Sequence, residues 1–191
     1  MRALILNGAN DSSSYVNMVG GIVADTIKNA GWQVESIDLR NKKIATCTGC
    51  FGCWLRTPGE CIINDDGRNV AKEIIRSDLV VFLSPVVFGG YSYELKKALD
   101  RVIPLILPTF VKVKGEMHHG RRYDRYPKLV SIGVMKEQDD EAAEVYEKLA
   151  VRNALNFHSP AYGACTLIVG TGTDDAGARI DAALKSVEVI A

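Results

Sequence analysis

Four of the chain's five cysteines lie close together in one stretch, "TCTGCFGCWLRTPGECIINDD", which runs from Thr46 to Asp66. Thiolates bind zinc and iron–sulfur clusters, and paired thiols can cycle as a disulfide. Two residues separate the first cysteine from the second and the second from the third, and seven residues separate the third from the fourth. This spacing brings three thiols into one tight turn that the fourth can close. The four residues are Cys47, Cys50, Cys53 and Cys61.

The spacing favours an iron–sulfur cluster over a structural zinc ion. Bacterial ferredoxin clusters also begin with a C-x2-C-x2-C pattern. Structural zinc sites more often use two separated C-x2-C pairs, each forming a knuckle around a tetrahedral ion. The third close cysteine therefore points to a cluster, while a zinc site, a redox-active disulfide and inert thiols stay open as alternatives.

The residues between these cysteines suit a loop that wraps around a bound group. Gly49, Gly52 and Gly59 let the backbone turn sharply, so that its N–H groups can point at sulfur. Phe51 and Trp54 can shield such a group from water, and they can also anchor the loop to the core.

The composition is that of an ordinary globular protein. Of 191 residues, 47% are hydrophobic and 24% are charged, which argues against disorder and suits one domain. The 23 basic and 23 acidic residues cancel, so no overall charge recruits nucleic acid or an anionic membrane. No apolar run reaches the length of a membrane span, and the apolar start is too short for a secretory signal. We expect a cytoplasmic protein, in which clustered cysteines hold metal or do redox work more often than they form permanent disulfides.

Short apolar runs alternate with segments of helical spacing along the chain. This βαβα rhythm predicts an α/β fold in which helices cover both faces of a five-stranded parallel sheet. We expect a single domain over residues 1–191, with two long connections at 41–66 and 104–127 that carry function. The predicted strands are 3–6, 33–39, 79–83, 129–135 and 165–170, and the predicted helices are 16–30, 67–77, 91–103, 139–156 and 175–189.

The loop after the first strand is a candidate phosphate site. In open α/β sheets ligands bind beyond the carboxyl ends of the strands, where a helix N-terminus offers free N–H groups. This loop contributes Asn10, Ser12, Ser13 and Ser14 as candidate ligands of a phosphate. It carries no Lys or Arg, and one serine can instead simply cap the helix.

The loop after the third strand has apolar residues where polar turn residues would be expected. Pro85 ends the strand and leaves Val86, Val87 and Phe88 at the edge of the sheet. Gly89 and the glycine after it allow a flat ligand to approach the backbone closely. The pattern predicts a site for a planar ring; the alternative is that a partner subunit or the second long connection covers this apolar patch.

Together these motifs resemble the NADPH-dependent FMN reductase superfamily of flavodoxin-like proteins, and most closely its iron–sulfur flavoprotein branch. The resemblance rests on "CTGCFGC…C…DD" followed by "SPVVFGGYS…LK…LDR", and it spans about residues 3–101. It implies a flavodoxin-like three-layer sandwich with strand order 2-1-3-4-5 and FMN at the carboxyl edge of the sheet. It also implies a homodimer or homotetramer that buries the flavin near the cysteines.

The resemblance assigns roles to individual residues. It implies that Cys47, Cys50, Cys53 and Cys61 ligate a [4Fe-4S] cluster, and that the flavin ring contacts Ser84, Pro85, Val86, Val87, Phe88 and Gly89. The chain departs from the family in its first loop, which usually reads G-S-P-R. It departs again after the fourth strand, where "MKEQDDEAAE" contains no glycine. These departures concern the contacts to the phosphate and to the far edge of the ring.

Other polar and thiol residues have structural interpretations. Asp65 and Asp66 precede a predicted helix, so we interpret them as its caps. Arg101 is interpreted as an internal ion-pair partner and Cys165 as a buried core thiol. The connection 104–127 is locally basic. It can receive the phosphates of NAD(P)H or an acidic electron-transfer partner, or it can form a solvated flap or an oligomer contact.

The sequence thus predicts an FMN-dependent oxidoreductase that passes electrons from NAD(P)H or a reduced carrier through flavin and a [4Fe-4S] cluster to a small-molecule or protein acceptor. No Ser/His/Asp triad or carboxylate pair stands out, so no catalytic side chain is predicted. One alternative is a cluster-free NAD(P)H-dependent FMN or quinone reductase whose cysteines hold zinc or cycle as a disulfide. Another is a non-catalytic redox sensor or electron carrier.

Overall fold

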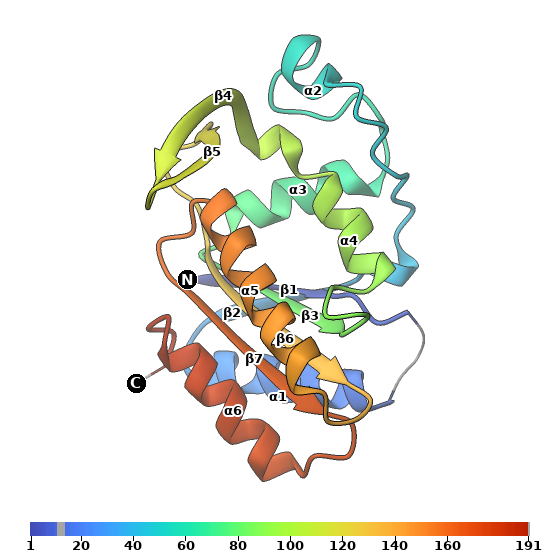
Figure 1. Cartoon of the computed structure of the whole chain (residues 1–191), viewed down its shortest axis with the longest axis vertical. Coiled ribbons are helices and arrows are strands. Elements are labelled where there is room, and N and C mark those ends of the chain that lie inside the picture. The colour runs from blue at the N-terminus through green and yellow to red at the C-terminus, as the bar shows by residue number, and fades with distance from the viewer. Residues whose placement is uncertain (11–13, 191) are drawn as a thin grey trace.

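The central element of the fold is a parallel sheet of five strands (Figure 1). The computed structural model describes residues 1–10 and 14–190. The strands lie in the order β2-β1-β3-β6-β7, which is the predicted order 2-1-3-4-5 once the two strands of a separate hairpin are set aside. The five strands are β1 (Arg2–Asn7), β2 (Gln33–Asp38), β3 (Leu79–Pro85), β6 (Lys128–Met135) and β7 (Tyr162–Ile168).

Helices cover both faces of this sheet, as predicted (Figure 1). Successive side chains of a strand point to opposite faces, so each strand contributes to two cores. In β1, Ile5 packs in one core and Leu6 in the other. The first core holds α1 (Ser14–Asn29) and α6 (Thr173–Lys185), and the second holds α3 (Asp66–Arg76), α4 (Tyr93–Asp100) and α5 (Asp140–Asn156).

Side chains fix where the helices on the second face begin. Asp65 accepts a hydrogen bond from the Gly67 N–H at 2.9 Å and so caps α3, as predicted. Ser92 accepts a hydrogen bond from the Leu95 N–H at 3.3 Å and caps α4. These two helices matter for function because the cysteine-bearing segment lies against them.

The connection 104–127, predicted as a long basic loop, instead contains a β-hairpin. β4 (Ile106–Val113) pairs antiparallel with β5 (Glu116–Arg121), and Lys114 and Gly115 between them have φ angles of 48° and 89°. Two successive positive φ angles are typical of the type I′ turn, which suits the twist of a hairpin. In the sequence, a hairpin is indicated by the Lys-Gly pair between segments that contain β-branched and aromatic residues. The basic residues of this connection favoured a solvated loop instead.

The other long connection, 41–66, contains only the short helix α2 (Gly52–Leu55). In Figure 1 α2 lies at one end of the molecule, beyond α3 and α4 and next to the hairpin. A 3₁₀ turn lies at the start of each long connection: Leu39–Asn41 at the start of 41–66 and Ile103–Leu105 at the start of 104–127. Among the residues that the structure describes, no helix is long and apolar enough to cross a membrane.

Candidate functional site

A tight turn at the end of β3 presents an exposed aromatic side chain. Val87 and Gly90 exchange two backbone hydrogen bonds of 3.0 and 2.9 Å, and the residues between them, Phe88 and Gly89, have φ angles of 50° and 71°. A bulky residue at positive φ is uncommon and costs backbone energy, which points to a role for its position. The Phe88 side chain is fully exposed, whereas Gly89 is buried against α5. We call residues 87–90 the rim turn.

The predicted ring contacts divide into two groups. Ser84 is buried, and its hydroxyl accepts the Ser92 N–H at 2.9 Å and donates to the Pro85 carbonyl at 2.8 Å. The side chain of Val86 packs so closely on Gly133 that a Cβ there would lie 2.7 Å from it. The side chains of Ser84 and Val86 therefore support the turn from inside, while Val87 and Phe88 reach the surface.

The loop after β1 lies beside the loop after β3 at the same edge of the sheet. The Gly8 N–H donates to the Leu83 carbonyl at 2.8 Å, and a Cβ on Gly8 would lie 2.7 Å from Leu95 in α4. Asn10 is exposed. Of the predicted phosphate ligands, Ser12 and Ser13 lie outside the described residues, and Ser14 begins α1.

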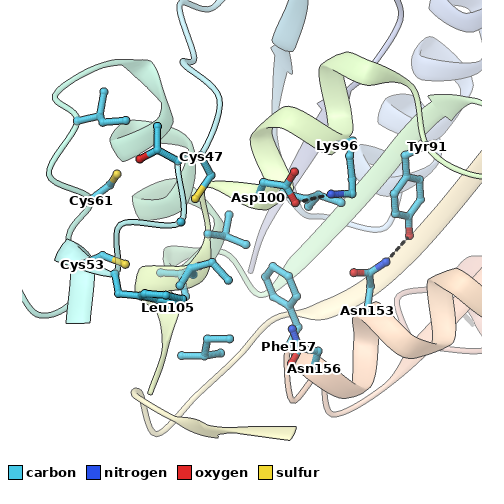
Figure 2. A pocket seen from close by; sticks show the side chains of 18 of the residues that line it. Cys47, Cys53, Cys61, Tyr91, Lys96, Asp100, Leu105, Asn153, Asn156 and Phe157 are labelled. Atoms are coloured by element: carbon cyan, nitrogen blue, oxygen red, sulfur yellow. Dashed lines mark hydrogen bonds and ion pairs between the residues drawn. The ribbon is translucent and has the colours of Figure 1, made fainter. Parts of the chain in front are cut away.

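All four clustered cysteines line one cleft of about 650 Å³. The cleft lies between the cysteine-bearing segment and helices α4 and α5. Figure 2 shows Cys47, Cys53 and Cys61 on one side of it and residues of the second core opposite. Its volume is in the range of small-molecule and cofactor sites. The rest of the lining is largely apolar, with Tyr91, Leu99, Leu105, Leu149 and Phe157, but it also includes Asn153 and the ion pair of Lys96 with Asp100.

Left-handed backbone and close packing shape the cysteine segment. Gly49 and Phe51 have φ angles of 64° and 54°, so the chain reverses just before α2. A Cβ on Gly52 would lie 2.5 Å from the Ile62 side chain, so only glycine lets α2 pack against the stretch that carries the fourth cysteine. The predicted wrapping role of these glycines agrees with this geometry.

The thiols of this cleft influence one another electrostatically. Burial raises the pKa of the Cys53 thiol, and negative charge on Cys61, Cys47 and Cys50 raises it further. The pKa of the exposed Cys50 thiol is lowered, chiefly by a hydrogen bond from the Gly52 N–H, with help from the Thr48 hydroxyl. A peptide N–H directed at sulfur is the contact that stabilises added charge at an iron–sulfur centre.

The four clustered thiols line one cleft but do not converge on one point. All five cysteines are free thiols. Within residues 1–10 and 14–190, no three His, Cys, Asp or Glu side chains converge closely enough to hold one metal ion. A [4Fe-4S] cluster takes its four thiolates on different irons, so its ligands stand farther apart than those around one tetrahedral ion.

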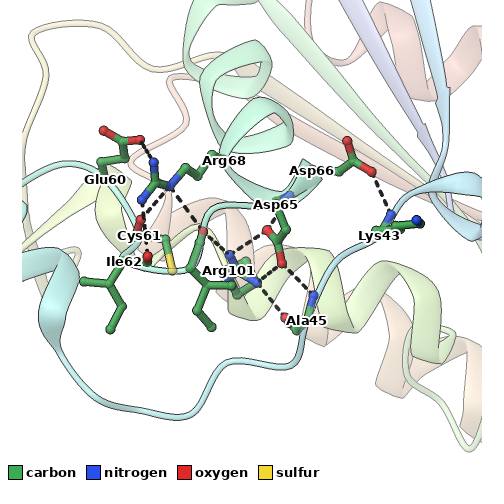
Figure 3. Close-up of polar contacts among 11 residues, drawn as sticks. Lys43, Ala45, Glu60, Cys61, Ile62, Asp65, Asp66, Arg68 and Arg101 are labelled. Atoms are coloured by element: carbon green, nitrogen blue, oxygen red, sulfur yellow. Dashed lines mark hydrogen bonds and ion pairs between the residues drawn. The ribbon is translucent and has the colours of Figure 1, made fainter.

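Arg101, at the end of α4, ties the two ends of the cysteine segment together (Figure 3). Its guanidinium is almost fully buried and makes two hydrogen bonds of 2.8 Å to the carboxylate of Asp65. It also donates to the carbonyl oxygens of Ala45 at 2.7 Å and Ile63 at 3.2 Å. The prediction that Arg101 is an internal ion-pair partner is therefore confirmed.

The surroundings of this buried pair favour the charged form of each partner. Burial would raise the pKa of Asp65, but hydrogen bonds from Arg101 and from the N–H groups of Ala45 and Gly67 outweigh it, so this pKa is lowered. Burial would lower the pKa of the Arg101 guanidinium, but Asp65 and the neighbouring thiol of Cys61 raise it. The guanidinium therefore carries its positive charge beside both its carboxylate partner and the fourth cysteine.

A second arginine holds the same stretch through its main chain (Figure 3). Arg68, in α3, donates from Nε to the Cys61 carbonyl at 2.7 Å and from Nη2 to the Ile62 carbonyl at 3.3 Å. It also forms an ion pair of 2.5 Å with Glu60. On the other side of the segment, Asp66 accepts the Lys43 N–H at 2.7 Å. Charged side chains therefore fix both ends of the cysteine segment.

Sequence reasoning missed the hairpin as part of this site. The Trp54 ring stacks on Phe51, and its Nε1–H donates to the Ile106 carbonyl of β4 at 2.9 Å. Trp54 also contacts His119 of β5, which in turn contacts Phe110. Trp54 thus anchors the cysteine segment to the hairpin rather than to the sheet. In the sequence, only the Lys114-Gly115 turn indicates the hairpin, and nothing indicates that Trp54 contacts it.

The fifth cysteine belongs to the sheet. Cys165 lies in β7, is half-buried, and packs against the first core. Burial raises the pKa of its thiol to about 12. It does not line the cleft. This agrees with its interpretation as a core thiol.

Known proteins with related sequences are iron–sulfur flavoproteins. One from Archaeoglobus fulgidus is 35% identical over 78 residues, which are 41% of this chain and 34% of that protein. One from Methanocaldococcus jannaschii is 30% identical over 105 residues, 55% of this chain and 53% of that protein. The aligned part thus spans between a third and about half of the length of these relatives.

Solved structures of similar fold include two oxidoreductases. An NAD(P)H:quinone oxidoreductase from Methanothermobacter marburgensis has a TM-score of 0.67 at 17% identity, with 97% of this chain and 93% of that chain covered. An FMN-dependent NADH-azoreductase from Bacillus anthracis, in complex with FMN, has a TM-score of 0.68 at 15% identity, with 97% and 98% covered. At these identities the likeness establishes the flavodoxin-like fold. The family described as NADPH-dependent FMN reductase matches residues 1–187, and the chain belongs to that family.

Proposed function

We propose that the protein is an FMN-dependent oxidoreductase that passes electrons from NAD(P)H or a reduced carrier, through flavin and a [4Fe-4S] cluster, to an acceptor. The observation that carries this proposal is the shared wall of two candidate sites. Gly90 closes the rim turn where the flavin ring is predicted, and together with Tyr91 it lines the cleft of the four cysteines. Two redox groups at these positions would be neighbours along one continuous surface.

The edge of the sheet supplies the features that FMN needs. The rim turn offers an apolar, exposed surface at Val87 and Phe88 for a planar ring. The N-terminus of α1 lies at the same edge, where its free N–H groups suit a phosphate. Family membership supports FMN as the cofactor. When bound, FMN accepts electrons in pairs from a hydride donor and releases them singly, which matches a one-electron cluster.

The cysteine cleft supplies the features that a cluster needs. Cys47, Cys50, Cys53 and Cys61 are the residues that would hold it. The Gly52 N–H is directed at the Cys50 sulfur, and the apolar opposite wall limits access of water. The names of the related proteins from Archaeoglobus and Methanocaldococcus support this assignment.

An anaerobic absorption spectrum with iron and sulfide analysis tests the proposal. Protein purified or reconstituted without oxygen should contain flavin together with about four irons and four sulfides per chain. Cys50→Ser should lose the broad iron–sulfur absorption while keeping the flavin bands. Cys165→Ser is the matched control, because this thiol lies in β7 outside the cleft, and it should keep both. Loss of neither signal in Cys50→Ser would refute the cluster assignment.

The flavin position has its own test at two exposed phenylalanines. Phe88→Asp places a charge on the rim turn and should weaken FMN binding by roughly tenfold or more, since a carboxylate cannot pack on the ring. Phe110→Asp changes another exposed phenylalanine, on the hairpin, and should leave FMN binding unchanged. Flavin fluorescence titration of the FMN-free protein measures both. Equal FMN affinities in the two variants would show that the flavin ring does not bind at the rim turn.

We further propose that the chain forms a homodimer or homotetramer. Apolar side chains gather around the cysteine segment and the hairpin, and a second subunit is one way to cover them. Light scattering of the cofactor-loaded protein measures the assembly, and a monomer would contradict this part of the proposal. The exposed side chains are Phe51, Leu55, Phe110 and Met117.

A further inference from the structure

The buried guanidinium of Arg101 has one donor left over. A guanidinium carries five N–H donors. The two terminal nitrogens donate to Asp65, to the Ala45 carbonyl and to the Ile63 carbonyl, which accounts for four of them. The fifth, Nε–H, is buried and has no hydrogen-bond partner among the described residues. Leaving a buried donor unpaired is costly, and such groups usually have an explanation.

A cysteine of the cleft lies next to this guanidinium. Negative charge on the Cys61 thiol favours the charged form of Arg101, so the two groups are coupled electrostatically. Figure 3 shows Cys61 beside Arg101, within the network that joins Arg101 to Asp65. Because Ile63 and Asp65 follow Cys61 closely in sequence, the bonds that hold Arg101 also fix where that sulfur can lie.

Arg101 is held here in one orientation. Its planar fork matches the carboxylate of Asp65 at two points, which a lysine cannot do. Gly67 leaves room for it, since a Cβ at that position would lie 3.2 Å from the guanidinium carbon. The fixed geometry holds a positive charge beside Cys61. In Figure 3, Cys61 and the contacts of Arg68 lie on one side of Arg101, and the carboxylate of Asp65 lies on the other.

We propose that Arg101 is a positioning residue for the redox centre: it fixes Cys61 as the fourth ligand, and its charge and remaining N–H favour the reduced form of that centre. This inference rests on the proposed cysteine-bound cluster. Reduction adds negative charge, which nearby positive charge and hydrogen bonds to sulfur stabilise. Asp65 acts in the opposite sense, because its carboxylate partly cancels the field of Arg101.

The two members of the ion pair therefore predict opposite shifts. Arg101→Met removes the positive charge and leaves Asp65, so the midpoint potential of the centre should become more negative. Asp65→Asn keeps the shape of the acceptor but removes the negative charge, so the potential should become more positive. A purely structural role would loosen the segment in both variants and would not reverse the sign of the shift.

Arg68→Met is the matched control. Arg68 holds the same stretch through the Cys61 and Ile62 carbonyls, and no contact between its side chain and a cysteine sulfur is seen in the described part of the chain. Its loss should speed the release of iron to a chelator, because the segment loosens, while the midpoint potential stays close to that of the wild type. Arg101→Lys keeps the charge without the fork, so it should likewise lose iron faster with little shift in potential.

The experiment is an anaerobic dye-coupled potentiometric titration of each reconstituted protein, with iron release to a chelator and thermal unfolding measured alongside. Shifts of opposite sign in Arg101→Met and Asp65→Asn support the proposal, and shifts of the same sign or no shift overturn it. If Arg101→Met does not fold, the other two variants test the proposal. A more positive midpoint potential in Asp65→Asn, with no shift in Arg101→Lys, supports the proposal. Any other pattern overturns it. A wild-type protein that takes up no iron overturns the cluster and this role together, whereas a loaded protein with insensitive potentials overturns the role of Arg101 alone.

Discussion

The sheet with its helices and the cysteine module, by which we mean residues 41–66 with 104–127, are held together by different forces. The central strands β1, β3 and β6 are buried on both faces, and apolar side chains fill the two cores. The cysteine module is held by charged side chains such as Arg101 and Arg68, and by the contacts of Trp54. Among the described residues, the module holds seven of the exposed large apolar side chains and the much larger rest of the chain holds six.

This difference separates stability from chemistry. A continuous apolar core gives a rigid frame whose free energy of unfolding does not depend on any single polar contact. A segment held by a few hydrogen bonds and ion pairs can open locally, as functional segments often do. In this protein the frame carries the rim turn and the cysteine module carries the thiols, so the two halves of the proposed electron path lie on parts of unequal stability.

The largest contrast we expect is in thiol reactivity. In the reduced, metal-free protein Cys50 is exposed with a lowered pKa, whereas the pKa of Cys165 is raised to about 12. Since the thiolate is the reactive form, a pKa about three units above the ordinary 9.0 reduces reactivity about a thousandfold. Timed alkylation at pH 7.5, read by peptide mass spectrometry, should label Cys50 first and Cys165 last. Equal rates would show that the sheet opens as readily as the cysteine module.

The same substitution should cost very different amounts in the two regions. Phe82 is fully buried in β3 and contacts the rings of Tyr91 and Phe157. Phe82→Ala should lower the free energy of unfolding by about 3–5 kcal/mol, because it removes buried area and leaves a cavity. Urea denaturation followed by circular dichroism measures the change.

Phe51→Ala is the control, since this ring is about half exposed and, among the described residues, stacks on Trp54 alone. It should cost under about 1 kcal/mol, and its effect should be confined to the cysteine module. Comparable losses in both variants would mean that the module is part of the cooperative core.

The frame could be predicted from the sequence because its signals are local and repeated. Apolar runs such as 79–83 mark strands buried on both faces, and the spacing of Val16, Val19 and Val23 marks the buried side of a helix. Strand order followed from the family resemblance. The hairpin was missed because its strands are largely exposed and show no run of buried apolar residues, so that only the Lys114-Gly115 turn distinguishes them from a loop.

The site was predicted less completely, because its walls come from distant parts of the chain. The spacing of the cysteines indicated that they act together, and they do share one cleft. Nothing local in the sequence indicates that Leu149 or Asn153 of α5 forms the opposite wall, since only the tertiary fold brings them there. Likewise Ser84 looks like a ligand in sequence, but its hydroxyl is used inside the protein.

A charged contact of the module should make stability depend on pH. The pKa of Asp65 is lower in the folded protein than in the unfolded chain, where it is about 3.9. The stabilisation from the ionised carboxylate is therefore complete above the unfolded-state pKa and is lost as the pH falls through the folded-state pKa. At pH 7, Asp65→Asn should cost about 1.5–3 kcal/mol, because the bonds to Arg101 lose their charge assistance. The difference between wild type and variant should shrink below about pH 4 in urea titrations. A difference that does not change with pH would assign the loss to shape instead of charge.

The smallest effect we expect is at the link between the cysteine segment and the hairpin. Trp54→Phe removes the hydrogen bond from Nε1 to the Ile106 carbonyl but keeps an aromatic ring beside His119. The cost should be about 0.5–1.5 kcal/mol, the usual worth of one neutral hydrogen bond. Amide hydrogen exchange should show faster exchange across 41–66 and 106–121 and no change in β3 or β6. Faster exchange that extends into those strands would mean that the module and the sheet open as one unit, and the distinction between frame and module would then not hold.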